Sequence, residues 1–224
     1  MNSKINHHIQ EWIDIVENQT YAVCEEQELL VEYVKRCFET EDIYTDDEQL
    51  DKYIGLAKYF PFEQVFPWQK FVIGLHDCTY WRETGMPRWP DLFCEIGRGA
   101  GKDGTIAWES VCLMSQYNGI REYDVDICAN NEDQAMRPVR DVINAFERPD
   151  VTRKLKRFFY WTKEQVSSLK TGSLMKGRTN NPKGKDGLRS GICIFNEIHQ
   201  YENYANLNVF TTGLGKKKHP RRSY

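Results

Sequence analysis

A glycine-rich turn, flanked by an apolar run and by the start of a helix, constrains this chain more than any other segment. Residues 92–96 read Leu-Phe-Cys-Glu-Ile, which predicts a short buried strand, and a helix is expected from Lys102 through Tyr117. Three glycines within residues 97–101 leave backbone N–H groups free of neighbouring Cβ atoms, so that several can point at one anion. The N-terminus of the helix adds partial positive charge. The segment therefore predicts a phosphate-binding loop.

This loop resembles a Walker A motif, in which a lysine supplies a point charge for the β- and γ-phosphates of a nucleotide. The usual pattern is G-x-x-x-x-G-K-[ST], but Ile96 stands at the first glycine position and Asp103 at the Ser/Thr position. Glycine-rich turns between a strand and a helix also occur for packing alone. The predicted nucleotide-binding residues are Gly97, Arg98, Gly99, Ala100, Gly101, Lys102, Asp103 and Gly104.

Composition adds little to this prediction. The 224 residues carry a net charge of −3, which does not by itself indicate a nucleic-acid partner. The seven cysteines form no C-x-x-C pair, so we expect reduced, mostly buried thiols rather than a metal site. The sequence contains no signal peptide, and no apolar run approaches the roughly 18 residues of a membrane span. We therefore expect no membrane partner.

The first part of the chain is acidic and patterned for helices. Apolar residues recur at helical spacing over residues 9–16 and 29–38. Residues 45–48, Thr-Asp-Asp-Glu, resemble an N-cap with acidic first-turn residues before a third helix through Lys58. We predict an α-helical N-terminal subdomain over residues 1–60, and a nucleotide-binding core over residues 61–224.

A further helix is expected to begin at Pro67, because proline is favoured in the first turn. The amide of Gln69 can both donate to and accept from an adenine edge, and Phe66 or Trp68 is suited to stack on the base. The alternative is a helix start with core aromatics and a surface glutamine. Lying before the phosphate loop, Gln69 is a candidate adenine-binding residue.

An α/β pattern follows the loop. Residues 124–129 predict a strand, and Asn130 and Asn131 are expected to cap a helix over residues 132–147. Pro138 lies too deep for a first-turn proline, so a kink or a late helix start is expected. The alternation of strands and helices predicts a mainly parallel sheet flanked by helices.

The charge balance reverses over residues 151–190, where eleven lysines and arginines face only Glu164 and Asp186. A β-hairpin is expected around Lys170-Thr171-Gly172. One interpretation is a set of solvated loops. The other is a basic surface that faces DNA phosphates or the ATP of a neighbouring subunit.

A second motif completes the predicted site. Residues 192–195 predict a buried strand, which ends at Asn196 and Glu197 in the manner of a Walker B motif. Glu197 occupies the position that orients the attacking water, whereas Asn196 replaces the usual aspartate. Because Asp103 replaces a hydroxyl residue on the loop, the total charge around a metal is conserved. We hypothesise that Asp103 supplies charge near Mg²⁺ and that Asn196 hydrogen-bonds a coordinating water; alternatively, the site binds nucleotide without hydrolysing it.

Taken together, these motifs resemble the N-terminal ATPase domain of the large terminase subunit of tailed bacteriophages, over about residues 5–222. The resemblance rests on Pro67-Trp68-Gln69, on residues 97–102, on residues 129–135, on Asn196 through Tyr201, and on residues 212–220. It implies a P-loop NTPase fold and Mg²⁺-dependent ATP hydrolysis. By position, Lys102 would bind the β/γ-phosphates, Arg98 would lie near the γ-phosphate, Gln69 would bind adenine and Glu197 would polarise the water.

The resemblance also implies partners. These are double-stranded DNA, further copies of the chain in a homo-oligomeric ring, the portal and the small terminase subunit, all in the host cytoplasm. An arginine finger from the adjacent subunit is expected, with Arg178 and Arg189 as candidates. We expect the ATPase core to be incomplete at its C-terminus, nuclease activity to be absent, and a second chain to be able to complete the domain. A helicase-like ATPase and a non-hydrolysing nucleotide-binding remnant or regulatory partner of a motor are the alternatives.

Overall fold

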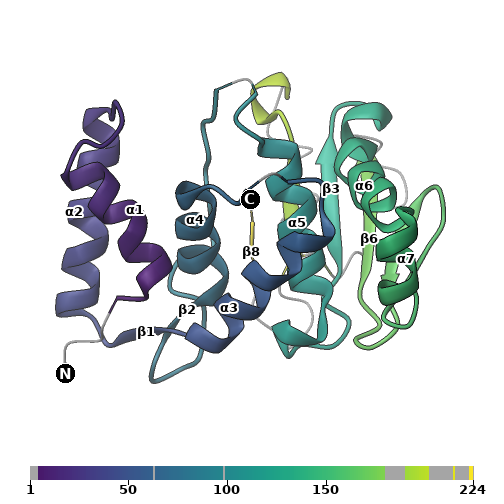
Figure 1. The fold of residues 1–224 in the computed structure, drawn as a ribbon, viewed down its shortest axis with the longest axis horizontal. Coiled ribbons are helices and arrows are strands. Elements are labelled where there is room, and N and C mark those ends of the chain that lie inside the picture. Colours follow the sequence, from purple (N-terminus) through teal and green to yellow (C-terminus); the bar gives the residue numbers. More distant parts are fainter. Residues whose placement is uncertain are drawn as a thin grey trace. The chain divides into compact units, whose positions relative to one another are not determined.

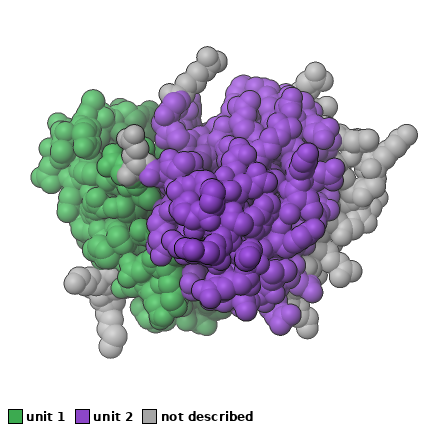
Figure 2. All heavy atoms as spheres, turned by 45° about the vertical axis from the view of Figure 1, so that its right-hand side comes forward, with its two compact units in different colours: residues 1–54, 63–90 green, residues 55–62, 91–224 purple. Residues whose placement is uncertain are grey.

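The computed structural model of the protein describes residues 5–62, 64–97, 99–179, 190–201 and 214, and the backbone of residues 222–223 (Figure 1). Two compact units are distinguished by their internal contacts (Figure 2). The helical unit comprises Met1–Ile54 and Glu63–Pro90, and the sheet unit comprises Gly55–Phe62 and Asp91–Tyr224. This division differs from the predicted boundary at residue 60, because residues 63–90 belong to the helical unit.

The helical unit is built around a core of apolar side chains from three helices and one short strand. It contains α1 (His7–Glu17), α2 (Glu25–Thr40), most of α3 (Asp47–Leu56) and α4 (Pro67–Cys78), with the short strands β1 (Ile43–Thr45) and β2 (Thr79–Trp81). Most of the apolar residues that recur at helical spacing face inward, as predicted, but Leu29 and Leu30 of α2 are 55% and 44% exposed. The buried core cluster consists of Ile9, Ile13, Val16, Val31, Val34, Cys37, Phe38, Ile43, Phe71 and Leu75.

Residues 63–90 join this unit because their apolar side chains complete its core. Phe71 and Leu75 of α4 lie in the core cluster with α1 and α2. β2 pairs with β1 in an antiparallel ladder, with Ile43 opposite Trp81. The predicted start of a helix at Pro67 is confirmed, but the sequence did not show which core that helix serves.

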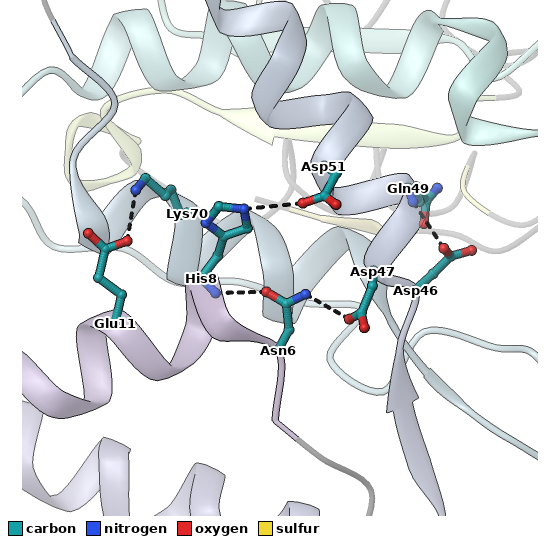
Figure 3. A network of polar contacts seen from close by, with 8 residues as sticks. All are labelled: Asn6, His8, Glu11, Asp46, Asp47, Gln49, Asp51 and Lys70. Carbon is teal, nitrogen blue, oxygen red and sulfur yellow. Dashed lines mark hydrogen bonds and ion pairs between the residues drawn. The ribbon is translucent and has the colours of Figure 1, made fainter.

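Polar side chains fix the starts of the helices in this unit (Figure 3). Asp46 accepts a hydrogen bond from the Gln49 N–H at 2.9 Å, which confirms the predicted cap of the third helix. Asn6 caps α1 by accepting from the His8 N–H at 2.8 Å, and its amide donates to Asp47 at 2.7 Å. α3 ends at Leu56, and the expected end at Lys58 falls within the 3-10 turn η1 (Ala57–Tyr59).

The sheet unit contains a six-stranded sheet in the order β4-β5-β6-β3-β7-β8. β3 pairs in parallel with both β6 and β7, β7 pairs in parallel with β8, and β4-β5-β6 is antiparallel. Helices α5 and α6 pack against β3 and β6 (Figure 1). The predicted α/β class, a mainly parallel sheet flanked by helices, is confirmed. The elements are α5 (Lys102–Met114), η2 (Gln116–Asn118), β3 (Val125–Ala129), α6 (Glu132–Phe146), α7 (Pro149–Leu155), β4 (Phe159–Trp161), β5 (Gln165–Ser168), β6 (Leu174–Thr179), β7 (Ile192–Phe195), η3 (Ile198–Gln200) and β8 (Arg222–Ser223).

Three local predictions for this unit need correction. Residues 92–96 form no strand: their side chains alternate between half-buried and exposed, and Phe93 is 76% exposed. An apolar run becomes a buried strand only where a neighbouring strand accepts its hydrogen bonds, and among the described residues none does so. The helix from Lys102 ends at Met114, because the chain turns at Ser115 into η2. α6 begins at Glu132 and continues through Pro138, so of the two outcomes expected at this proline the late start is wrong, and the kink stays a prediction.

The hairpin predicted around residues 170–172 is confirmed. β5 and β6 form an antiparallel pair, and Gly172 adopts a φ of +77° in the turn between them. A left-handed backbone of this kind favours glycine.

Among the described residues, every helix is too short or too polar to cross a bilayer.

Candidate functional site

The loop before α5 has the backbone geometry that its glycines predicted. Gly99 and Gly101 adopt φ values of +81° and +89°, a left-handed region in which a Cβ atom is strained. Gly101 is the N-cap of α5, so the orphan N–H groups of the first turn follow directly after the loop. A Cβ atom added at Gly97 or Gly99 would meet no atom of the described residues within 4 Å, so both face open space within that part of the chain. This combination fits an anion; Arg98 lies outside the described residues.

The first turn of α5 is fixed by its own packing. Thr105 donates to the Gly101 carbonyl twice, from its N–H at 3.0 Å and from its hydroxyl at 2.9 Å. A Cβ atom at Gly104 would lie 2.9 Å from Cε1 of Phe62. Gly104 was predicted as a nucleotide-binding residue, and the structure adds a packing reason for glycine there.

Lys102 joins the two predicted halves of the site. Its Nζ donates to Oδ1 of Asn196 at 2.9 Å and forms a short ion pair with Oε1 of Glu197. The Lys102 and Glu197 side chains are 28% and 31% exposed. The hydrogen bond from Lys102 holds the pKa of Glu197 below its usual value. The phosphate loop and the acidic strand therefore meet at one point, as their positions in the sequence predicted.

Glu197 lies in a strained turn directly after β7. Its φ of +56° places a non-glycine residue in the left-handed region, a geometry that often marks functional positions. Before it, the Asn196 N–H extends the β3–β7 ladder by donating to the Cys128 carbonyl at 2.9 Å. After it, η3 begins at Ile198. The ladder and the turn together aim the Glu197 carboxylate at Lys102.

Asp103 has one oxygen that fits a hard cation. Its Oδ1 is buried and, among the described residues, accepts no hydrogen bond. Its Oδ2 lies 3.7 Å from Nη1 of Arg137. Burial, and then the negative charge of Asp103, raise the pKa of Asp141. A carboxylate oxygen left without a donor costs free energy unless a cation or water satisfies it, and carboxylate and amide oxygens are the ligands that Mg²⁺ accepts.

The contribution of α6 was not predicted from the sequence. Gln134, Arg137 and Asp141 follow one another at helical spacing, so they share one face of this helix. Arg137 lies beside Asp103, and its positive charge also helps to lower the pKa of Glu197. The helical spacing of these three residues is visible in the sequence. It does not by itself indicate a role in the site, because the sequence does not show that α6 packs beside α5.

The start of α6 is tied to the segment after Glu197. Asn131 caps the helix by accepting from the Gln134 N–H at 2.9 Å, as predicted for this asparagine pair. Asn130 donates to the Gln200 carbonyl in a short hydrogen bond, and Nε2 of Gln134 donates to Oε1 of Gln200 at 2.8 Å. The first turn of α6 therefore holds the Glu197 turn in place.

Other predicted residues have partners of their own. Gln69 belongs to the helical unit, where its buried side chain accepts from the Phe66 N–H at 2.8 Å and caps α4. Arg178 donates from Nε to Oδ1 of the buried Asp126 at 2.7 Å, with 30% of its side chain exposed. Arg189 lies outside the described residues. Gln69 and Arg178 therefore have structural roles whatever else they do.

Comparison with known proteins supports the family suggested by these motifs. The structure of the HK97 bacteriophage large terminase matches with a TM-score of 0.63 and 18% sequence identity, covering 80% of this chain and 37% of that one. A point mutant of the Thermus phage P74-26 large terminase ATPase domain matches with a TM-score of 0.41 and 16% identity, covering 55% of each chain.

The chain thus spans little more than a third of the HK97 large terminase. A search of curated protein sequences finds no match. The family model for the terminase large subunit ATPase domain matches residues 67–222, which include the loop, the acidic strand and the sheet. The chain therefore belongs to the terminase large subunit ATPase domain family, which implies a nucleotide-binding ATPase.

Proposed function

We propose that this chain is the ATP-hydrolysing module of a viral DNA-packaging motor, with its catalytic centre at the α5 N-terminus and the end of β7. The observation that carries the proposal is the position of the Lys102 ammonium. It contacts Asn196 and Glu197 at the mouth of a loop that faces open space. A phosphate loop and an acidic strand arranged in this way are the two parts that nucleotide hydrolysis requires.

Each residue then has a role when ATP binds. Lys102 exchanges its contacts with Asn196 and Glu197 for the β- and γ-phosphates, since a triphosphate carries more negative charge than either partner. Glu197, released from Lys102, accepts a hydrogen bond from the attacking water and orients it. The α5 N-terminus and the loop N–H groups stabilise the phosphate charge. Arg98, which the family resemblance puts near the γ-phosphate, adds a further cation.

For the metal, we propose Asp103 and Asn196 as the residues that hold Mg²⁺. The buried Oδ1 of Asp103, which accepts no hydrogen bond from any described residue, supports this assignment. When bound, Mg²⁺ supplies charge neutralisation for the phosphate oxygens. The variants Asp103→Ser, Asn196→Asp and the combination test the idea. We expect Asp103→Ser to lower turnover and the double variant to recover part of that loss, whereas additive losses would refute the charge exchange.

ATP turnover with Mg²⁺, measured over a range of protein concentrations, tests the central proposal. Glu197→Gln is the matched control, because it keeps the shape of the side chain and loses the charge. We expect turnover to rise more than linearly with protein concentration, because a neighbouring copy completes the site, and to fall by at least about 100-fold in the control. ATP binding without turnover at any concentration would instead indicate a non-hydrolysing binding protein.

We also propose Gln69 as the adenine-binding residue. Because its Oε1 caps α4, truncation to alanine alters stability as well as recognition. Gln69→Glu separates the two effects, since a carboxylate still accepts from the Phe66 N–H but lacks the amide donor. We expect Gln69→Glu to weaken ATP binding without weakening GTP binding, while the melting temperature of the same variant measures the cost of placing a carboxylate at this buried position.

The remaining assignments belong to the assembled motor. We propose double-stranded DNA as the substrate that is moved, a homo-oligomeric ring that contacts the portal and the small terminase subunit, and the host cytoplasm as the place of action. Arg178 and Arg189 are the proposed arginines for a neighbouring active site. If Arg178 acts in this way, its Nε stays bound to Asp126, and the 30% of its side chain that is exposed is the part available to a neighbouring copy.

A further inference from the structure

Pro138 removes a hydrogen bond from the middle of α6. The helix runs from Glu132 to Phe146 with this proline in its interior. In an α-helix each carbonyl accepts from the N–H four residues later. Proline has no N–H, so the Gln134 carbonyl lacks the donor that residue 138 would otherwise supply. A carbonyl in this state needs a donor from elsewhere.

The donor comes from the acidic strand. Nδ2 of Asn196 lies 3.5 Å from the Gln134 carbonyl oxygen, a long hydrogen bond, while Oδ1 of the same amide accepts from Lys102 at 2.9 Å. Asn196 is only 3% exposed. Reversing its amide would bring N–H₂ against an ammonium group and an oxygen against a carbonyl. The two contacts therefore fix which end of the amide faces the lysine.

Gln134 also reaches the other side of the Glu197 turn. Its Nε2 donates to Oε1 of Gln200 at 2.8 Å. One residue of α6 thus contacts the side chains of Asn196 and Gln200, which lie on either side of Glu197. Because Glu197 holds a strained φ of +56°, the turn needs such fixed neighbours to persist.

We propose that Pro138 is a positioning residue for the phosphate-binding lysine. By leaving the Gln134 carbonyl without its helical donor, it favours asparagine over aspartate at position 196. The asparagine oxygen is thereby directed at Lys102. An aspartate has no N–H to give, and would place a negative oxygen against an unpaired carbonyl. This accounts for an amide where the Walker B pattern has an acid, and it rests on the proposed role of Lys102.

A double-mutant cycle between Pro138→Ala and Asn196→Asp tests the coupling. With Pro138 present, Asn196→Asp leaves the Gln134 carbonyl unpaired, and we expect the melting temperature to fall by about 3–6 °C. In the Pro138→Ala background, the restored N–H satisfies that carbonyl, so the same change is expected to cost less than half as much. Pro149→Ala is the matched control: Pro149 stands in the first turn of α7, where its missing N–H has no helical acceptor.

Nucleotide measurements separate positioning from mere packing. In the same variants we expect Asn196→Asp to lower kcat for ATP, Pro138→Ala to restore at least part of it, and Pro149→Ala to restore none. Additive losses in melting temperature in a protein that hydrolyses ATP would overturn the inference and leave the proposed function standing. A parent protein that neither binds nor hydrolyses ATP would overturn the proposed function, and with it the role assigned to Pro138.

Discussion

The helical unit and the sheet unit both contain a partly buried pair of a glutamate and a long cation, but the surroundings of the cations differ. In the helical unit, Arg88 forms a two-point contact with Glu41, and its Nη2 also donates to the Tyr33 hydroxyl at 3.1 Å. Its guanidinium lies 5.0 Å from the ring centres of both Trp81 and Trp89. The cation is enclosed by groups that belong to the same unit, which is what stability requires.

In the sheet unit, Lys102 has a less favourable position. It is the first residue of α5, where the helix dipole repels a cation. Its partners are Asn196 and the strained Glu197, and the loop beside it faces open space. A cation held against the helix dipole next to an open loop is poorly placed for stability and well placed to bind an anion. Enclosure, not pairing alone, therefore distinguishes the structural cation Arg88 from Lys102, the cation that we propose binds phosphate.

Removing the functional cation gives the largest expected effect. We predict that Lys102→Ala lowers ATP turnover by about 1,000-fold, because it removes charge stabilisation where charge develops. The melting temperature should fall only slightly, because the loss of the ion pair with Glu197 is offset in part by the removal of a cation that the helix dipole repels. Turnover and thermal unfolding of the same preparation are the measurements. A large fall in melting temperature with turnover retained would make Lys102 the structural cation instead.

Removing the structural cation, Arg88, should lower the stability of the protein rather than its ATP turnover. We predict that Arg88→Ala destabilises the protein by about 2 kcal/mol, because it leaves the Glu41 carboxylate without its partner, and lowers the melting temperature by about 4–8 °C. Arg88→Lys is the matched control: it keeps the charge but loses the two-point contact, so an intermediate shift is expected. Thermal unfolding measures both. If Arg88→Ala melts like the parent, enclosure does not stabilise this pair.

Acid should weaken both pairs. The hydrogen bond from Arg88 lowers the pKa of Glu41, and that from Lys102 lowers the pKa of Glu197. A carboxyl with a lower pKa in the folded state contributes stability above its usual pKa of about 4.5, and this contribution is lost as the pH falls through the folded value.

The pH dependence can be measured by thermal unfolding of Glu41→Gln and Glu197→Gln between about pH 6 and pH 3. Each variant should lose less stability over this range than the parent does, because one carboxylate that must take up a proton is gone. If either variant falls as steeply as the parent, its carboxylate does not contribute to the acid sensitivity.

The smallest effect on the melting temperature is expected for an exposed ion pair. Nζ of Lys52 lies 2.6 Å from Oε1 of Glu48, which is one turn away on α3, and the two side chains are 42% and 79% exposed. Solvent screens such a pair, so Lys52→Ala should change the melting temperature by no more than about 1–2 °C. A larger shift would show that pairing contributes without enclosure, and would weaken the contrast between Arg88 and Lys102.

Much of the site followed from the sequence because it depends on local rules. The Gly101 cap, the helix at Lys102 and the strand that ends at Asn196 are short-range features, and the carboxyl ends of parallel strands meet at one edge. The strand expected over residues 92–96 failed for the opposite reason. Its apolar pattern is local, but the hydrogen-bonding neighbour that a strand needs is not.

The contribution of α6 could not be predicted for a related reason. The spacing of Gln134, Arg137 and Asp141 defines a face of a helix, but the sequence does not say what that face contacts. Pro138 predicted only a local irregularity of the helix. Its proposed effect on Asn196 depends on the packing of α6 against β3 and β6, which is a tertiary contact.

The contact between Phe62 and Gly104 bears on how the protein can be divided. The chain passes between the two units three times: residues 55–62 belong to the sheet unit while residues on both sides of them belong to the helical unit, and the chain returns to the sheet unit after Pro90. Phe62 also packs edge-on against Trp108, so this short segment supports the first turns of α5. A shortened protein beginning at Pro67, where the family match begins, would therefore lose part of the support beneath the phosphate loop. The residue at which the family match begins is therefore not a residue at which the protein can be shortened without losing this support.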